Sequence, residues 1–104
     1  MVVHNETESR FELRLGDGEL AVLEYRIVDN TMIFTHTGVP AIHEGRGYGG
    51  QLARAGLDYA RNAGMQIVPA CSFIAAFIRR NPEYAGSVPE AHRTAAPSCQ
   101  IRRS

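Results

Sequence analysis

The sequence of 104 residues contains no lysine, no tryptophan and no excess of charge of either sign. Its basic residues are all arginines, and eleven of them balance eleven aspartates and glutamates. Proteins of this size that bind DNA or RNA usually carry a basic excess, because the neutralisation of phosphates supplies most of their affinity. The balanced charge therefore argues against a nucleic-acid partner and against electrostatic docking on a membrane.

Long apolar runs and clustered cysteines are missing as well. No stretch approaches the roughly 20 apolar residues that a membrane-spanning helix needs, and the first residues lack the charged, apolar and small-residue segments of a secretory signal. The two cysteines, Cys71 and Cys99, form no CxxC motif. We expect both to be reduced thiols in a cytoplasmic protein.

The composition is that of one folded domain with polar ends. Hydrophobic residues make up 44% of the chain, which is enough for a packed core, and 11.4 kDa corresponds to a single domain. Residues 1–9 are polar, and residues 87–104 are rich in Pro, Ala, Ser, Thr and Arg. We expect both segments to be flexible, which leaves residues 10–86 as the domain.

The first half of the domain predicts strands. Apolar and polar residues alternate in residues 10–15 and 19–29, and residues 31–39 are rich in β-branched and aromatic side chains. Turn residues separate the runs at 16–18 and 29–30. In the second run, Ala21, Leu23, Tyr25 and Ile27 share one face. These patterns predict an antiparallel meander of three strands.

The second half predicts two helices around one more strand. Apolar residues recur at helical spacing in residues 48–62, and Gly64 is suited to close that helix. Residues 65–71 predict a buried strand, and Ser72 is expected to cap a second helix that ends before Pro82. A helix between two strands implies a right-handed crossover and parallel pairing. The predicted fold class is therefore α/β (α+β).

The most informative segment is Glu44-Gly-Arg-Gly-Tyr-Gly-Gly50, between the third strand and the first helix. Backbone amides at a helix N-terminus form a ready anion site, and glycine lets a phosphate approach the chain closely. Four glycines within six residues are more than a simple helix start requires. We therefore interpret this segment, the glycine loop, as an anion-binding loop.

Three phosphate-binding signatures compete for the glycine loop. A Walker loop is excluded because it needs a lysine. Gly45-x-Gly47-x-x-Gly50 matches the dinucleotide pattern, but three antiparallel strands precede it and no acidic residue lies between Asp58 and Glu83 to hold a ribose. The loop instead resembles the acetyl-coenzyme A signature Gln/Arg-x-x-Gly-x-Gly/Ala of the GCN5-related N-acetyltransferases. Glu44 then occupies the Gln/Arg position, which costs one side-chain contact.

The resemblance extends beyond the loop. His36-Thr-Gly-Val-Pro40 precedes it and Cys71-Ser-Phe73 follows the next predicted strand. In this order and spacing the three motifs resemble the small YjdJ-type acetyltransferase-like subfamily, over about residues 10–84. The chain lacks the N-terminal helices of larger members, where much of the acceptor site is built. The resemblance implies a minimal fold of this family.

The resemblance also implies how acetyl-coenzyme A binds. The third and fourth predicted strands splay apart, and the pantetheine arm enters between them, paired with backbone of the third strand. Backbone amides of residues 46–50 hold the pyrophosphate, and Arg46 supplies charge. The implied cofactor-binding residues are Thr37, Gly38, Val39, Glu44, Gly45, Arg46, Gly47, Tyr48, Gly49 and Gly50.

Three residues are candidates for the chemistry. Cys71 lies before a helix N-terminus, where thiolates are stabilised, and is either an acyl-accepting nucleophile or a small buried hydrophobe. His36 is a candidate general base, or a hydrogen-bonded strand histidine. By analogy with tyrosines of the family, Tyr84 is the acid for the leaving thiolate, with a core tyrosine as the alternative. His43 is interpreted as a loop residue, and the spacing of His36, His43 and Cys71 predicts no metal site.

The sequence thus supports two main hypotheses. The first is a cytoplasmic N-acetyltransferase that transfers the acetyl group of acetyl-coenzyme A to an unidentified amine on a small molecule or a protein. The alternative is a module that binds coenzyme A or acyl-coenzyme A without efficient turnover. A third, weaker hypothesis is a small interaction domain whose loop binds only free phosphate.

Overall fold

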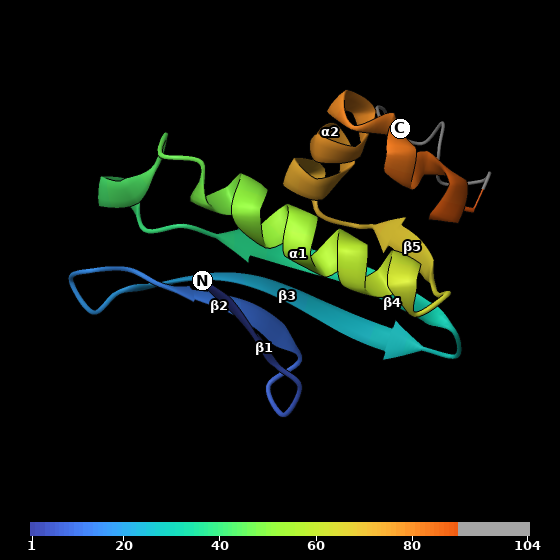
Figure 1. Ribbon diagram of the computed structural model, residues 1–104, viewed down its shortest axis with the longest axis horizontal. Helices are drawn as coiled ribbons and strands as arrows, with labels where there is room; N and C mark the ends of the chain where they lie inside the picture. Colours follow the sequence, from blue (N-terminus) through green and yellow to red (C-terminus); the bar gives the residue numbers. More distant parts are fainter. Residues whose placement is uncertain (90–104) are drawn as a thin grey trace.

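The computed structural model describes residues 1–89 (Figure 1). Cys99 and all but the first three residues of the expected 87–104 tail therefore lie outside the described residues. The described part forms one five-stranded sheet with two helices and two short 3-10 helices. The helical elements are η1 (Ala41–His43), α1 (Tyr48–Asn62), α2 (Ser72–Arg80) and η2 (Pro82–Ser87).

The five strands lie in the sheet in their chain order. The first four pair antiparallel, and the last pairs parallel to its neighbour because α1 crosses over between them. The strands are β1 (Val2–Asn5), β2 (Arg10–Arg14), β3 (Leu20–Val28), β4 (Thr31–Gly38) and β5 (Gln66–Pro69). This architecture confirms the predicted fold class and the order of meander, helix, parallel strand and helix.

The N-terminus differs from the expectation of a flexible segment, because residues 2–5 form β1 at the sheet edge. The ring of His4 stacks on Phe11 with 4.2 Å between ring centroids, and its Nε2 is hydrogen-bonded to the hydroxyl of Tyr25. A histidine here packs as an apolar residue would. The strand was not predicted because histidine counts as polar in a sequence pattern.

Helix α1 lies across the sheet and packs mainly against β3 and β2 (Figure 1). Its buried face is made of Leu52, Ala53, Leu57 and Ala60, as predicted, and it also includes Gly56. A Cβ on Gly56 would stand 2.7 Å from Leu23 and 3.0 Å from Phe34, so the helix backbone approaches the sheet as closely as a glycine allows. The periodicity of the sequence predicts α1, and Gly56 sets its distance from the sheet.

The structure differs from the predictions at three residues. Cys71, rather than Ser72, is the N-cap of α2. Ile27 is 49% exposed although it alternates with buried residues, because the pairing of β2 with β3 ends at Glu24 and this end of β3 extends past β2. Val88 is 2% exposed and belongs to the core, so the packed domain reaches past the boundary predicted at residue 86.

Neither helix of the described residues is long and apolar enough to span a membrane.

Candidate functional site

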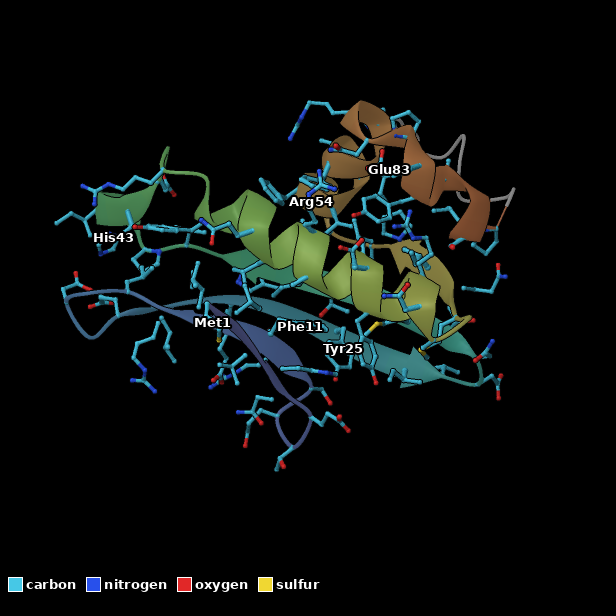
Figure 2. All side chains as sticks on the ribbon, viewed as in Figure 1. Met1, Phe11, Tyr25, His43, Arg54 and Glu83 are labelled. Carbon is cyan, nitrogen blue, oxygen red and sulfur yellow. The ribbon has the colours of Figure 1, made fainter. Side chains whose placement is uncertain are left out.

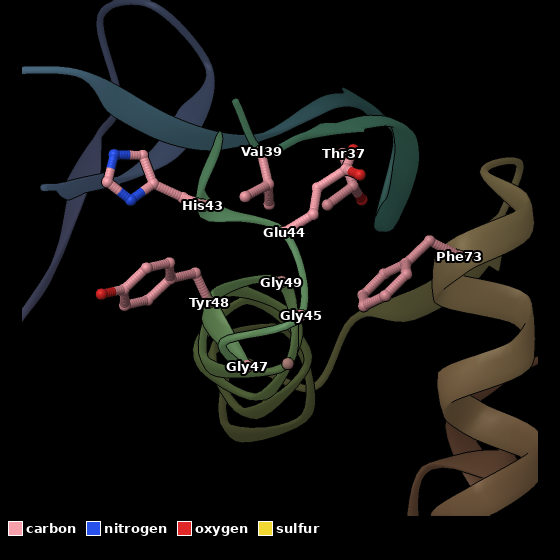
Figure 3. A pocket seen from close by; sticks show the side chains of 10 residues that line it. Thr37, Val39, His43, Glu44, Gly45, Gly47, Tyr48, Gly49 and Phe73 are labelled. Atoms are coloured by element: carbon pink, nitrogen blue, oxygen red, sulfur yellow. The ribbon is translucent and has the colours of Figure 1, made fainter. Parts of the chain in front are cut away.

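A cleft of about 380 Å³ opens where β4 ends, the glycine loop turns and α1 begins (Figure 3). Eight of the ten expected cofactor-binding residues line it, and Gly38 and Arg46 are the two that do not. His43 and Phe73, which the resemblance did not assign, complete the wall. The lining residues that were expected are Thr37, Val39, Glu44, Gly45, Gly47, Tyr48, Gly49 and Gly50.

The two parallel strands part beside this cleft. The pairing of β4 with β5 ends at Phe34 opposite Pro69, whereas β4 continues to Gly38. Proline has no amide hydrogen to donate to the ladder, and the amide of Ala70 donates instead to the carbonyl of Val68, so the chain turns away. Residues 35–38 therefore keep a strand edge that β5 does not pair with.

A bulge in β4 decides which side chains face the cleft. Tyr25 of β3 pairs with Phe34, but the preceding Glu24 pairs with His36, which leaves Thr35 as the extra residue. Beyond the bulge Thr37 pairs with Leu23 and faces the helices, while His36 is turned to the opposite face of the sheet. Sequence alternation alone could not place these two residues.

Thr37 lies against the first turn of α2. Its hydroxyl oxygen is 3.4 Å from the sulfur of Cys71, a free and partly buried thiol at the N-cap of that helix. Cys71 is not itself part of the cleft wall, but its contact Thr37 and the nearby Phe73 are. The structure thus brings Cys71 next to the unpaired edge of β4.

The structure requires glycine at positions 47 and 49 for different reasons. Gly47 is the N-cap of α1 and has φ +83°, a left-handed conformation that side chains disfavour. Gly49 is helical, but a Cβ there would stand 2.9 Å from the ring of Phe73. No side chain of the described residues caps α1, so the amides of its first turn remain available to an anion.

The cleft contains little charge. Glu44 is the one carboxylate that the described residues place in its wall, and no arginine among them lines it, since Arg46 is exposed outside the wall. The role of Arg46 in supplying charge at the loop therefore stays a prediction.

His43 was not predicted as a site residue. It is 9% exposed, and its Nε2 donates a hydrogen bond of 2.8 Å to Asp17 in the β2–β3 turn. This bond, together with one from the amide of Glu19, lowers the pKa of Asp17. The second ring nitrogen, Nδ1, is buried without a hydrogen-bond partner among the described residues. Nothing in the spacing of residues 17 and 43 signals this contact.

Two of the three expected catalytic residues lie away from the cleft. His36 is exposed on the opposite face of the sheet. Tyr84 is fully buried beside the middle of α1, where its hydroxyl donates a 2.6 Å hydrogen bond to Asp58 and accepts one from Arg54. Burial, and then the Asp58 carboxylate, raise the pKa of Tyr84. The geometry is that of the core tyrosine given as the alternative.

Comparison with known proteins finds a matching family model and a solved structure with a similar fold. Residues 10–87, three quarters of the chain, match the family model described as GCN5-related N-acetyl-transferase. The solution NMR structure of a GCN5-like candidate N-acetyltransferase from Staphylococcus aureus is similar, with a TM-score of 0.67 and 24% sequence identity. The match covers 94% of this chain and 96% of that one. None of the curated protein sequences matches this chain.

Proposed function

Because the chain belongs to the GCN5-related N-acetyltransferase family, we propose that it is an acetyltransferase whose donor is acetyl-coenzyme A, bound in the cleft at the glycine loop. We further propose that it is one of the small YjdJ-type members of that family. The observation that carries the donor assignment is the parting of β4 and β5 directly beside that loop. An extended ligand with amide groups can pair with the strand edge of residues 35–38.

The residues present fit the phosphates of such a donor. The left-handed Gly45 and Gly47 leave open space where a Cβ would project, and the uncapped first turn of α1 offers backbone amides. Helix N-termini with these properties favour anions. The glycine loop would hold the pyrophosphate, and Thr37 to Val39 would hold the pantetheine arm.

Acetyl transfer to an amine breaks the carbon–sulfur bond of the thioester and forms a carbon–nitrogen bond. The departing sulfur gains a proton, and the amine loses one. Cys71 is the residue we assign to this chemistry, because it lies next to the strand edge that would carry the thioester end. In the proposed route its thiolate attacks the acetyl carbon, and the amine then takes the acetyl group from Cys71.

The position of Thr37 supports this role of Cys71 as the nucleophile. Its hydroxyl lies within reach of the Cys71 sulfur and can donate a hydrogen bond to the thiolate. His36 and Tyr84 have no place in the proposal, since His36 is exposed on the opposite face of the sheet and Tyr84 is buried in the core against Asp58. We also propose a cytoplasmic location, where Cys71 stays reduced.

The test is incubation with acetyl-coenzyme A followed by peptide mapping by mass spectrometry. We expect one acetyl group on Cys71, in a Cys99→Ser background that removes the second thiol. The Cys71→Ser protein should bind coenzyme A but transfer acetyl to amines far more slowly. Undiminished transfer by Cys71→Ser would show that the amine attacks the donor directly.

The same experiment separates the alternative function. A module that only binds coenzyme A would bind it tightly yet acetylate neither Cys71 nor any amine of a test panel. The absence of His36 and Tyr84 from the cleft is the observation that favours this alternative. Calorimetry with coenzyme A, with adenosine diphosphate and with inorganic phosphate separates both functions from a loop that binds only phosphate.

A further inference from the structure

Two glycines at the start of α1 face two phenylalanines of α2. A Cβ on Gly49 would stand 2.9 Å from the ring of Phe73, and one on Gly50 would stand 3.7 Å from the ring of Phe77. The two phenylalanines are four residues apart, so they project from the same side of α2. Phe77 is 7% exposed and belongs to the core, whereas Phe73 is 37% exposed. The same row of side chains therefore continues from the core into the wall of the cleft.

The ring of Phe73 is held in one place by the helix that it faces. The three atoms at its tip, Cζ, Cε1 and Cε2, lie 2.9 to 3.4 Å from where a Cβ on Gly49 would stand. Figure 3 shows the ring extending from α2 toward the first turn of α1. Gly49 is part of the helix, so its lack of a side chain serves to make room for the ring. The ring thus bridges the two helices beside the cleft.

Phe73 also stands between the cleft and the thiol of Cys71. Cys71 is the N-cap of α2, and its sulfur is 3.4 Å from the hydroxyl oxygen of Thr37. Among the described residues, Thr37 is the one that β4 contributes to the wall of the cleft, and Phe73 is the one that α2 contributes. Cys71 itself does not line the cleft. A group bound in the cleft therefore reaches the sulfur between the side chains of Thr37 and Phe73.

We propose that Phe73 determines which acyl group is transferred, because its ring against Gly49 narrows the way to Cys71 so that acetyl fits and longer chains do not. This inference rests on the proposed function, since it assumes that the acyl group passes to Cys71. The reaction is the same for every acyl group. A bond forms between the acyl carbon and the Cys71 sulfur, the carbon–sulfur bond of the donor breaks, and the thiol proton ends on the departing sulfur. The length of the chain changes only its fit beside the ring.

The test compares acetyl-coenzyme A with butyryl-coenzyme A as donors to the full chain with Cys99→Ser. The rate at which acyl-Cys71 appears is measured by mass spectrometry. We expect the wild-type cleft to prefer acetyl by at least about a hundredfold, since a single methylene group changes the discrimination by about 10–200-fold. Phe73→Ala removes the ring and should bring the two rates within about tenfold of each other, with Phe73→Leu between. The buried face of α2, which consists of Ile74, Phe77 and Ile78, is left intact in both variants.

Alkylation of Cys71 provides a readout that needs no acyl transfer. The rates with iodoacetamide, a small reagent, and with fluorescein maleimide, a bulky one, are each divided by the rate for free cysteine. The ratio of bulky to small should rise by about tenfold in Phe73→Ala, the lower end of the discrimination that one hydrocarbon group supplies. Tyr59→Ala is the matched control, because Tyr59 is also 37% exposed but packs beside His4 and does not line the cleft. It should leave the alkylation ratio and the donor preference as in the wild type.

Overturning results are distinct for the two proposals. If neither donor acylates Cys71 in any variant, the proposed function fails at its covalent step. Acetylation of Cys71 with the same donor preference in the wild type and Phe73→Ala overturns this inference alone, as does a wild type that accepts butyryl as readily as acetyl. An alkylation ratio that Phe73→Ala leaves unchanged also overturns it. If Phe73→Ala does not fold, the same comparisons with Phe73→Leu decide the question.

Discussion

The first turn of α1 and the rest of the helix use their polar groups in opposite ways. Figure 2 shows Arg54 of α1 on the side of η2, the segment that carries Glu83. From the middle of the helix onward, Arg54 donates hydrogen bonds to Asn81 and Tyr84, and Asp58 accepts one from Tyr84. At its N-terminus the helix begins with Tyr48-Gly-Gly and no side chain of the described residues caps it. A helix anchored at one end and along its buried face can leave its first amides unpaired, and these are the amides that an anion requires.

The largest expected effect tests the anchoring. Gly56→Ala places a Cβ against Leu23 and Phe34 at distances that force a shift. We expect the free energy of unfolding to fall by about 1–3 kcal/mol, the usual cost of overpacking. Gly50→Ala is the matched control for stability, because its Cβ would meet Phe77 at an ordinary 3.7 Å.

Urea unfolding followed by circular dichroism measures both variants. A Gly56→Ala protein as stable as the wild type would show that α1 can move away from the sheet at no cost. The distance of α1 from the sheet would then not be fixed by its buried face. The contrast between an anchored part and an open first turn of α1 would no longer hold.

The second test compares two glycines in left-handed conformations at opposite ends of α1. Gly47 has φ +83° before the helix and Gly64 has φ +71° after it, and a Cβ on either would meet no atom within 4 Å. Replacing either by alanine should lower the free energy of unfolding by about 1–2 kcal/mol through backbone strain. Gly47→Ala alone should also weaken coenzyme A binding, by about tenfold or 1.4 kcal/mol.

Calorimetry with coenzyme A reads out the difference between the two variants. Equal affinity in Gly47→Ala and Gly64→Ala, both matching the wild type, would remove the glycine loop from the binding site. Equal weakening in both would mean that strain anywhere on α1 reaches the cleft.

The third test asks whether the anchored end takes part in the chemistry. Tyr84→Phe removes the hydrogen bond to Asp58 and should lower the free energy of unfolding by about 1 kcal/mol. The rate of acetyl transfer and its pH profile should stay as in the wild type. A loss of rate of about a hundredfold, the least that general acid catalysis contributes, would reinstate Tyr84 as the acid.

Tyr84→Phe should also change how the free energy of unfolding depends on pH in the alkaline range. The raised pKa of Tyr84 means that the folded protein holds this proton more tightly than the unfolded chain. Its contribution to stability is complete below the ordinary tyrosine pKa of about 10 and is lost as the pH rises through the folded value. Tyr84→Phe should flatten this loss, and burial of Tyr25, whose pKa is also raised, accounts for the slope that remains.

The sequence could predict the features that depend on local patterns, but not those that depend on contacts between distant segments. Strand alternation, the helical period over residues 48–62 and the glycine loop follow from local patterns, and the structure has the elements they predict. The bulge at Thr35 and the contact of Asp17 with His43 depend on how distant segments meet. His36 lies on the far face because one extra residue reverses the alternation, and no local pattern reports such a residue.

The smallest expected effect concerns the carboxylate of Glu44 in the wall of the cleft. Glu44→Gln removes a negative charge from beside the proposed phosphate site and should strengthen coenzyme A binding by about two- to threefold, since exposed charges interact weakly in water. Glu83→Gln is the matched control, because Glu83 pairs with Arg54 at the anchored end. Its affinity should equal that of the wild type.

Salt distinguishes an electrostatic gain from a structural one. The advantage of Glu44→Gln should shrink as the ionic strength rises from about 0.01 M to 1 M, because the screening length falls from roughly 30 Å to 3 Å. An advantage that persists at high salt would mean that the introduced amide makes a new hydrogen bond to the ligand, from the position that glutamine holds in the family signature. A weaker or unchanged affinity would place Glu44 away from the phosphates, and the open end of α1 would then bind its ligand in a register different from the one proposed.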